Sequence, residues 1–131
     1  AIADEYKCYQ SGKLAALYTG ICYFQMGQYE DAAEYLKKFD AKDVNVAPAA
    51  LQLLGDTYVR LEDYNNAAKA FEGAAKSGNK VIAPMSLRKL GFVYIELGDK
   101  AAAKKAFETI KNEYPASAEA SDIDKYISIA E

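Results

Sequence analysis

Histidine and tryptophan are absent from this chain of 131 residues, which also has only two cysteines and three prolines. Without histidine, the sequence excludes Ser–His and Cys–His nucleophile pairs and every metal site that uses an imidazole ligand. Cys8 and Cys22 form no CxxC motif and cannot make a zinc site alone. Cys22 lies in an apolar stretch and is predicted to be a small core residue, with a Cys8–Cys22 disulfide as the alternative.

The chain also has no excess of positive charge, because it contains 16 Lys and Arg residues and 19 Asp and Glu residues, which gives a net charge of −3. A dedicated nucleic-acid binder would show a basic stripe. The longest segment without a charged residue, Leu14 to Tyr29, has sixteen residues and is shorter than the ~20 apolar residues of a membrane span. We therefore expect the 131-residue chain itself to contact neither nucleic acid nor a membrane. The 24 alanines favour a single helical domain.

One pattern occurs three times along the chain, a glycine followed three residues later by a tyrosine. The glycines, Gly20, Gly55 and Gly91, lie 35 and 36 residues apart. Each is followed by alanine twelve residues later and by Leu or Phe sixteen residues later. Because apolar residues recur at helical spacing within each half, every unit is predicted to be two helices joined by a tight turn. The predicted turns are Gly27-Gln28, Glu62-Asp63 and Gly98-Asp99.

The position of the repeat glycines within helices needs a physical reason, because glycine there costs about 1 kcal/mol relative to alanine. Close approach of the paired helices is the simplest reason. We predict that the three glycines face Ala32, Ala67 and Ala103 where the paired helices cross, since larger side chains would hold the helices apart.

The pattern resembles the tetratricopeptide repeat, a unit of about 34 residues with the order L-G-x-x-Y, Ala, Phe and Pro. The matching residues of the second unit are Leu54, Gly55, Tyr58, Ala67, Phe71 and Ala74. Those of the third unit are Leu90, Gly91, Tyr94, Ala103, Phe107 and Pro115. The first unit is looser, because Thr19 replaces the Leu and Leu36 replaces the Phe. The resemblance implies an all-α, right-handed superhelical solenoid of three helix-turn-helix units with a C-terminal capping helix.

The expected division of this single domain, 1–131, follows the repeat register. Residues 1–7 are predicted to end a preceding helix, so that the chain begins inside a truncated repeat. The three repeats are expected at 13–46, 48–81 and 84–116. A capping helix or half repeat is expected at 117–130, with Ser117 as a candidate N-cap.

Motifs for chemistry are missing, since the sequence has no GxxxxGK[ST], GxGxxG, GxSxG or HExxH. The scattered acidic and basic residues fit a solvated helix face. We therefore expect no enzyme activity, no catalytic residue, no metal and no cofactor.

The family resemblance implies that the first helix of each unit lines a concave groove that holds a peptide or partner segment. The groove positions in the second and third units are Gln52, Asp56, Val59, Arg60, Arg88, Phe92, Ile95 and Glu96. The alternative is a groove that is only solvated or self-filled. One subclass of the family binds the C-terminal carboxylate of a peptide with Lys and Asn side chains of the first helices. Leu17 and Ile21 occupy the matching positions of the first unit and cannot donate hydrogen bonds, so carboxylate binding is disfavoured here. Arg88 and Lys89 remain as anchors for an acidic ligand, but we expect a peptide with apolar anchors and modest salt sensitivity.

The corresponding residues of the first unit, Leu17, Ile21 and Phe24, form an apolar strip in a segment without charge. Proteins seldom leave such strips open. We expect another element to cover them: a missing N-terminal repeat, the residues before Gly12, or a second copy of the chain in a homodimer.

The expected function is that of a protein–protein interaction scaffold or adaptor with a protein or peptide partner. The Gly-Tyr units, Tyr-Pro-Ala-Ser after the last repeat and the closing segment 122–127 resemble bacterial envelope proteins of this repeat family. Several of these are tethered by an N-terminal membrane helix and help assembly or quality control. This resemblance favours a periplasmic or envelope-facing location, through a missing N-terminal anchor, over a cytoplasmic one. The alternatives are a cytosolic chaperone adaptor and a self-associating structural domain.

Overall fold

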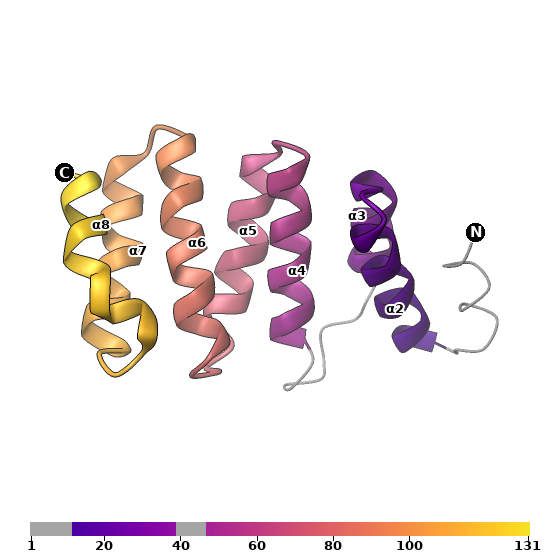
Figure 1. Ribbon diagram of the computed structural model, residues 1–131, viewed down its shortest axis with the longest axis horizontal. Helices are drawn as coiled ribbons and strands as arrows, with labels where there is room; N and C mark the ends of the chain where they lie inside the picture. The colour runs from indigo at the N-terminus through magenta and orange to yellow at the C-terminus, as the bar shows by residue number, and fades with distance from the viewer. Residues whose placement is uncertain (1–11, 39–46) are drawn as a thin grey trace.

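The computed structural model describes residues 12–38 and 47–131, and all regular structure in these residues is helical. The helices are α2 (Gly12–Gln25), α3 (Tyr29–Lys38), α4 (Ala47–Arg60), α5 (Tyr64–Ala75), α6 (Ile82–Glu96), α7 (Lys100–Glu113), the 3-10 helix η1 (Ala118–Asp122) and α8 (Ile123–Ile129). They stand side by side in one row, with α2 at one end and α8 at the other (Figure 1). The predicted helical-repeat solenoid is confirmed. The helix end expected at residues 1–7 lies outside the described residues.

Helices pack in consecutive pairs, α2 with α3, α4 with α5, and α6 with α7. Turns 26–28, 61–63 and 97–99 join the members of each pair. Adjacent pairs meet through α3 with α4 and through α5 with α6, and α4 also contacts α6 directly. This arrangement brings the first helices of the second and third units next to each other, with α5 against both.

Each turn contains one residue in the left-handed backbone conformation. Gly27 and Gly98 occupy this place with φ of 77° and 78°, but the middle turn uses Glu62 with φ of 58°. The next residue in the second and third turns is an aspartate that caps the following helix. The Asp63 carboxylate accepts from the Asn66 N–H at 3.3 Å and that of Asp99 accepts from the Ala102 N–H at 3.0 Å.

The repeat glycines lie against the large side chain of the paired helix. A Cβ atom on Gly55 would lie 2.5 Å from the Phe71 ring, and Gly91 is packed against Phe107 in the same way. Gly20 has the same relation to the shorter Leu36. The predicted close approach is therefore present, but the alanines expected opposite the glycines are not their nearest neighbours. A long helical side chain leans toward the N-terminus of its helix, so the residue one turn after the alanine reaches the glycine.

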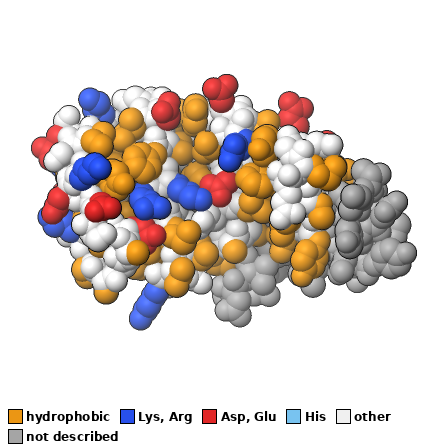
Figure 2. Space-filling model, in the orientation of Figure 1, with side chains coloured by type: hydrophobic (Ala, Val, Ile, Leu, Met, Phe, Trp, Pro, Cys, Tyr) orange, Lys and Arg blue, Asp and Glu red, His pale blue; other side chains and the backbone are white. Residues whose placement is uncertain are grey.

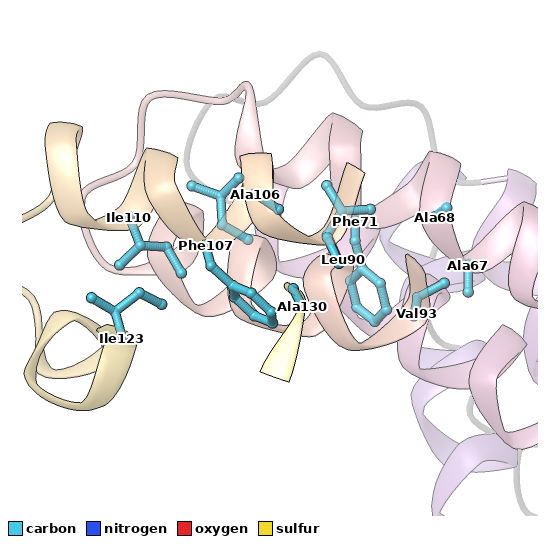
Figure 3. Close-up of a cluster of buried hydrophobic side chains, with 12 residues drawn as sticks. Ala67, Ala68, Phe71, Leu90, Val93, Ala106, Phe107, Ile110, Ile123 and Ala130 are labelled. Atoms are coloured by element: carbon cyan, nitrogen blue, oxygen red, sulfur yellow. The ribbon is translucent and has the colours of Figure 1, made fainter. Parts of the chain in front are cut away.

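The main core cluster joins the second and third units to the C-terminal cap. Phe71, Leu90, Phe107 and Ile110 gather between α5, α6 and α7, and Ile123 closes the end from α8 (Figure 3). Ile123 is 2% exposed, so α8 covers apolar surface that the last pair would otherwise present to water. Ser117 caps as predicted, accepting from the Ala120 N–H at 3.3 Å, although the element that it starts is η1.

The first unit has a smaller core. Leu36 packs with Leu17 and with Ala50 of α4. Thr19 is fully buried, and its hydroxyl has no hydrogen-bond partner among the residues that the structure describes. Cys22 is a free thiol that packs, half-buried, against a small cluster of α2 and α3, whereas Cys8 lies outside the described residues.

Replacing Gly55 with alanine is expected to lower the free energy of unfolding by about 1–3 kcal/mol, because the buried Phe71 ring must move. Gly73→Ala is the matched control within α5. Its Cβ would lie 3.3 Å from a methyl of the half-buried Leu51, which can adjust. The control is expected to keep or raise stability through helix propensity. Urea unfolding measures both variants, and equal effects of the two would contradict the packing assignment.

Glu62→Gly is expected to raise the free energy of unfolding by about 1 kcal/mol, because an L side chain is disfavoured in the left-handed conformation. Gly98→Ala is the converse variant at the equivalent turn. A Cβ there would have no neighbour within 4 Å, so only the backbone penalty changes. Thermal unfolding should show a higher midpoint for the first variant and a lower one for the second. Shifts in the same direction would refute this explanation.

Candidate partner-binding groove

A hollow of about 330 Å³ lies between α4 and α6, with α5 behind it. Its walls are formed by Asp56, Val59, Tyr64, Phe71, Lys89, Phe92, Val93, Ile95 and Glu96. Five of the eight predicted groove residues are among them: Asp56, Val59, Phe92, Ile95 and Glu96. On the face that carries α4 and α6, charged side chains of both signs lie side by side among hydrophobic ones (Figure 2).

An ion pair links the two helices across the hollow. The Lys89 ammonium lies 2.8 Å and 3.0 Å from the two carboxylate oxygens of Asp56, and both side chains are about one-third exposed. The same ammonium is 5.9 Å from the centroid of the Phe71 ring. Lys89 was expected to be available as an anchor for an acidic ligand, but in the structure its ammonium group is paired with the Asp56 carboxylate.

Of the remaining predicted groove residues, Gln52, Arg60 and Arg88, none lines this hollow. Gln52 accepts a hydrogen bond at 3.1 Å from the buried Ser86 hydroxyl and so joins α4 to α6. The Arg60 guanidinium lies 5.7 Å from the centroid of the Tyr29 ring. Arg88 is half-buried on α6.

Phe92 connects the hollow to the C-terminal cap. Its side chain is 39% exposed. Its ring makes edge-to-face contacts with Phe107 at 5.6 Å and with Tyr126 of α8 at 5.1 Å. The groove wall and the capping helix therefore share one aromatic cluster.

Two segments of the sequence match family models. Residues 1–74 match the family described as anaphase-promoting complex, cyclosome, subunit 3, and residues 85–117 match the tetratricopeptide repeat. The chain belongs to the tetratricopeptide repeat family.

Two solved structures, both crystal structures of MamA, have the same fold as this tetratricopeptide repeat protein, each with a TM-score of 0.66. They are 24% and 25% identical to it in sequence. The alignments cover 91% of this chain and 76% and 71% of the MamA chains. No curated protein matches the sequence.

The apolar strip of the first repeat unit is partly covered by neighbouring residues of α3 and α4. Leu17 is only 7% exposed and packs with residues of α3 and α4. Ile21 packs against the same cluster, and Phe24 lies edge-to-face on Tyr29 at 5.3 Å. Among the described residues, the contacts to the strip come from α3 and α4. Ile21 and Phe24 remain half-buried, and a cover from a preceding repeat, the residues before Gly12 or a second copy stays a prediction.

Residues that the sequence analysis did not select also line surfaces of this tetratricopeptide repeat protein. Tyr64 stands in the groove hollow, and its equivalence to Tyr29 was the available sequence signal. Two further hollows of about 430 and 440 Å³ share Leu87 and Leu90 between α5, α6 and α7. Tyr94 lines one of them, and burial, followed by the nearby Glu72 charge, raises the pKa of its hydroxyl.

Across residues 12–38 and 47–131, no group of three or more Cys, Asp or Glu side chains is placed to hold a metal ion. In the same residues, no helix combines the length and hydropathy that a membrane crossing requires.

The Asp56–Lys89 pair is expected to show a coupling free energy of about 0.5–1 kcal/mol in a double-mutant cycle of Asp56→Asn and Lys89→Gln. Since both groups are partly exposed, the coupling should fall as salt is added. The cycle on Lys111 and Asp124, a more exposed pair at 2.8 Å, is the matched control and should give a smaller value. Chemical unfolding measures both cycles. Equal couplings, or no salt dependence, would contradict the expectation.

Proposed function

We propose that this chain is a protein–protein interaction scaffold that holds a peptide or partner segment in the groove between α4 and α6. The observation that carries the proposal is the hollow that gathers five predicted groove residues from two helices. The repeat family and the MamA-like fold support the scaffold class. A scaffold of this kind acts by binding and needs no catalytic residue.

The chemistry of the walls supports an apolar anchor on the partner. Val59, Phe92 and Ile95 present hydrophobic surface to the hollow. Two of the charged residues that line it, Asp56 and Lys89, already form an ion pair with each other. A partner that replaced this ion pair would have to desolvate and break it, so these two charges favour binding less than burial of apolar side chains on the other walls does.

We further propose that the scaffold serves envelope assembly or quality control in a bacterium, as part of a protein with an N-terminal membrane anchor. The support is the resemblance of the Gly-Tyr units and of the closing segment 122–127 to envelope proteins of the repeat family. A cytosolic chaperone adaptor is the competing assignment. A full-length sequence with one N-terminal apolar span of ~20 residues would favour the envelope role.

Self-association is a second candidate function, and α2 supplies the observation that favours it. Tyr18 on this helix is 47% exposed, and Met26 in the turn that follows it is 44% exposed, while the helix carries no charge beyond Lys13. Exposed apolar surface on a repeat unit is typical of an interaction interface. Sedimentation in dilute solution distinguishes the candidates, since a structural domain is expected to dimerise and an adaptor to remain a monomer.

Photo-crosslinking tests the groove. A benzoyl-phenylalanine at Phe92 keeps an aromatic side chain in the groove wall, whereas the same residue at the exposed Glu108 on α7 lies outside the hollow. In the native host, the position-92 protein is expected to form a crosslinked product of defined mass that the position-108 protein does not form. The same product from both positions, or a product from position 108 alone, would contradict the groove.

A further inference from the structure

The two junctions between repeat units carry a different residue at one equivalent position. Tyr29 and Tyr64 both stand nine residues after their repeat glycine, at the start of α3 and α5. Arg60 and Glu96 both stand five residues after the next glycine, at the ends of α4 and α6. At the first junction, the Arg60 guanidinium covers the Tyr29 ring at 5.7 Å.

At the second junction, Tyr64 and Glu96 line the groove hollow together. A carboxylate cannot replace the guanidinium there, because the face of an aromatic ring is electronegative. Among the residues that line this hollow, the one cation is Lys89, and its ammonium is bound to Asp56. The second junction thus presents a tyrosine and a carboxylate at the place where the first junction has a tyrosine and an arginine.

We propose that this hollow binds an arginine side chain of the partner, which stacks on Tyr64 and pairs with Glu96. The inference rests on the proposed function and names the residue that the groove recognises. The chain itself provides the precedent, since Arg60 lies on Tyr29 at the equivalent place. Asp56 and Glu96 against Lys89 leave the hollow with one negative charge in excess, which favours a cation.

Arginine fits these walls better than lysine does. Its planar guanidinium stacks on an aromatic face while it donates to a carboxylate, whereas an ammonium is a compact and strongly hydrated charge. The methylene groups of the side chain can lie along Val59 and Ile95, the apolar residues of the same hollow. The volume of about 330 Å³ is enough for one such side chain and its solvent.

An NMR titration of the whole chain with N-acetyl-arginine amide tests the inference, and N-acetyl-citrulline amide is the control of equal shape without charge. The arginine probe is expected to shift the Tyr64 ring signals and to bind about fivefold more tightly than the citrulline probe. Equal affinities, or shifts that map away from Tyr64, would overturn the proposal.

Two substitutions at one position sharpen the result. Glu96→Gln is expected to reduce the affinity for the arginine probe, because the ion pair is lost while the contact with Tyr64 remains. Glu96→Arg recreates the residue of the first junction and should abolish probe binding while thermal unfolding shows an intact fold. Unchanged binding of the arginine probe by either variant would refute the assignment of Glu96.

Selection from a random peptide library separates this inference from the proposed function. Enrichment of arginine in peptides that crosslink to benzoyl-phenylalanine at Phe92 supports both proposals. Peptides that crosslink there without enrichment of arginine would leave the groove in place and overturn the arginine site. If the selected peptides crosslink only from Glu108, both the groove and the arginine site are wrong.

Discussion

The contact between a bare glycine backbone and a large side chain of the paired helix sets the spacing on which the rest of this solenoid depends. Phe71 occupies the space beside Gly55, and Phe107 occupies the space beside Gly91. The rings are fully buried and belong to one continuous core cluster. Helix α5 packs against both α4 and α6, which belong to different pairs, and Asp56 and Lys89 meet across this junction. The Phe71 ring also lines the hollow there, so part of its wall is the side chain that packs against Gly55.

The repeat could be predicted because the same geometric requirement recurs at a fixed interval. Gly27 and Gly98 mark turns that need a residue in the left-handed conformation. The repeat spacing identified the middle turn as well, although Glu62 occupies that position there. The direction of side chains was harder to predict. The alanines expected opposite the glycines share a helix face with Phe71 and Phe107, and a periodicity argument identifies the face without saying which residue reaches across.

The residues around the hollow were predicted in part, for a related reason. Positions transferred from the repeat family identify residues on first helices, and Asp56, Phe92 and Glu96 are among those that line the hollow. That they bind a partner stays a prediction. Tyr64 was missed because it belongs to the second helix of its unit. The partnership of Asp56 with Lys89 was missed because the two residues occupy different repeat positions, so no comparison of the units pairs them. Contacts between repeats depend on the rotation of one unit relative to the next, and the pattern of residues in a single sequence does not predict that rotation.

Differences between junctions therefore carry more functional information than the repeat itself. Arg60 covers Tyr29 at the first junction, whereas Tyr64 and Glu96 line the hollow together at the second. The first arrangement is completed by residues of the chain itself. The second combines an aromatic ring, apolar walls and an acidic residue in one hollow. A solenoid gains specificity in this way, because its repeated residues fix the spacing of the helices and a substitution at one junction determines what that surface can bind.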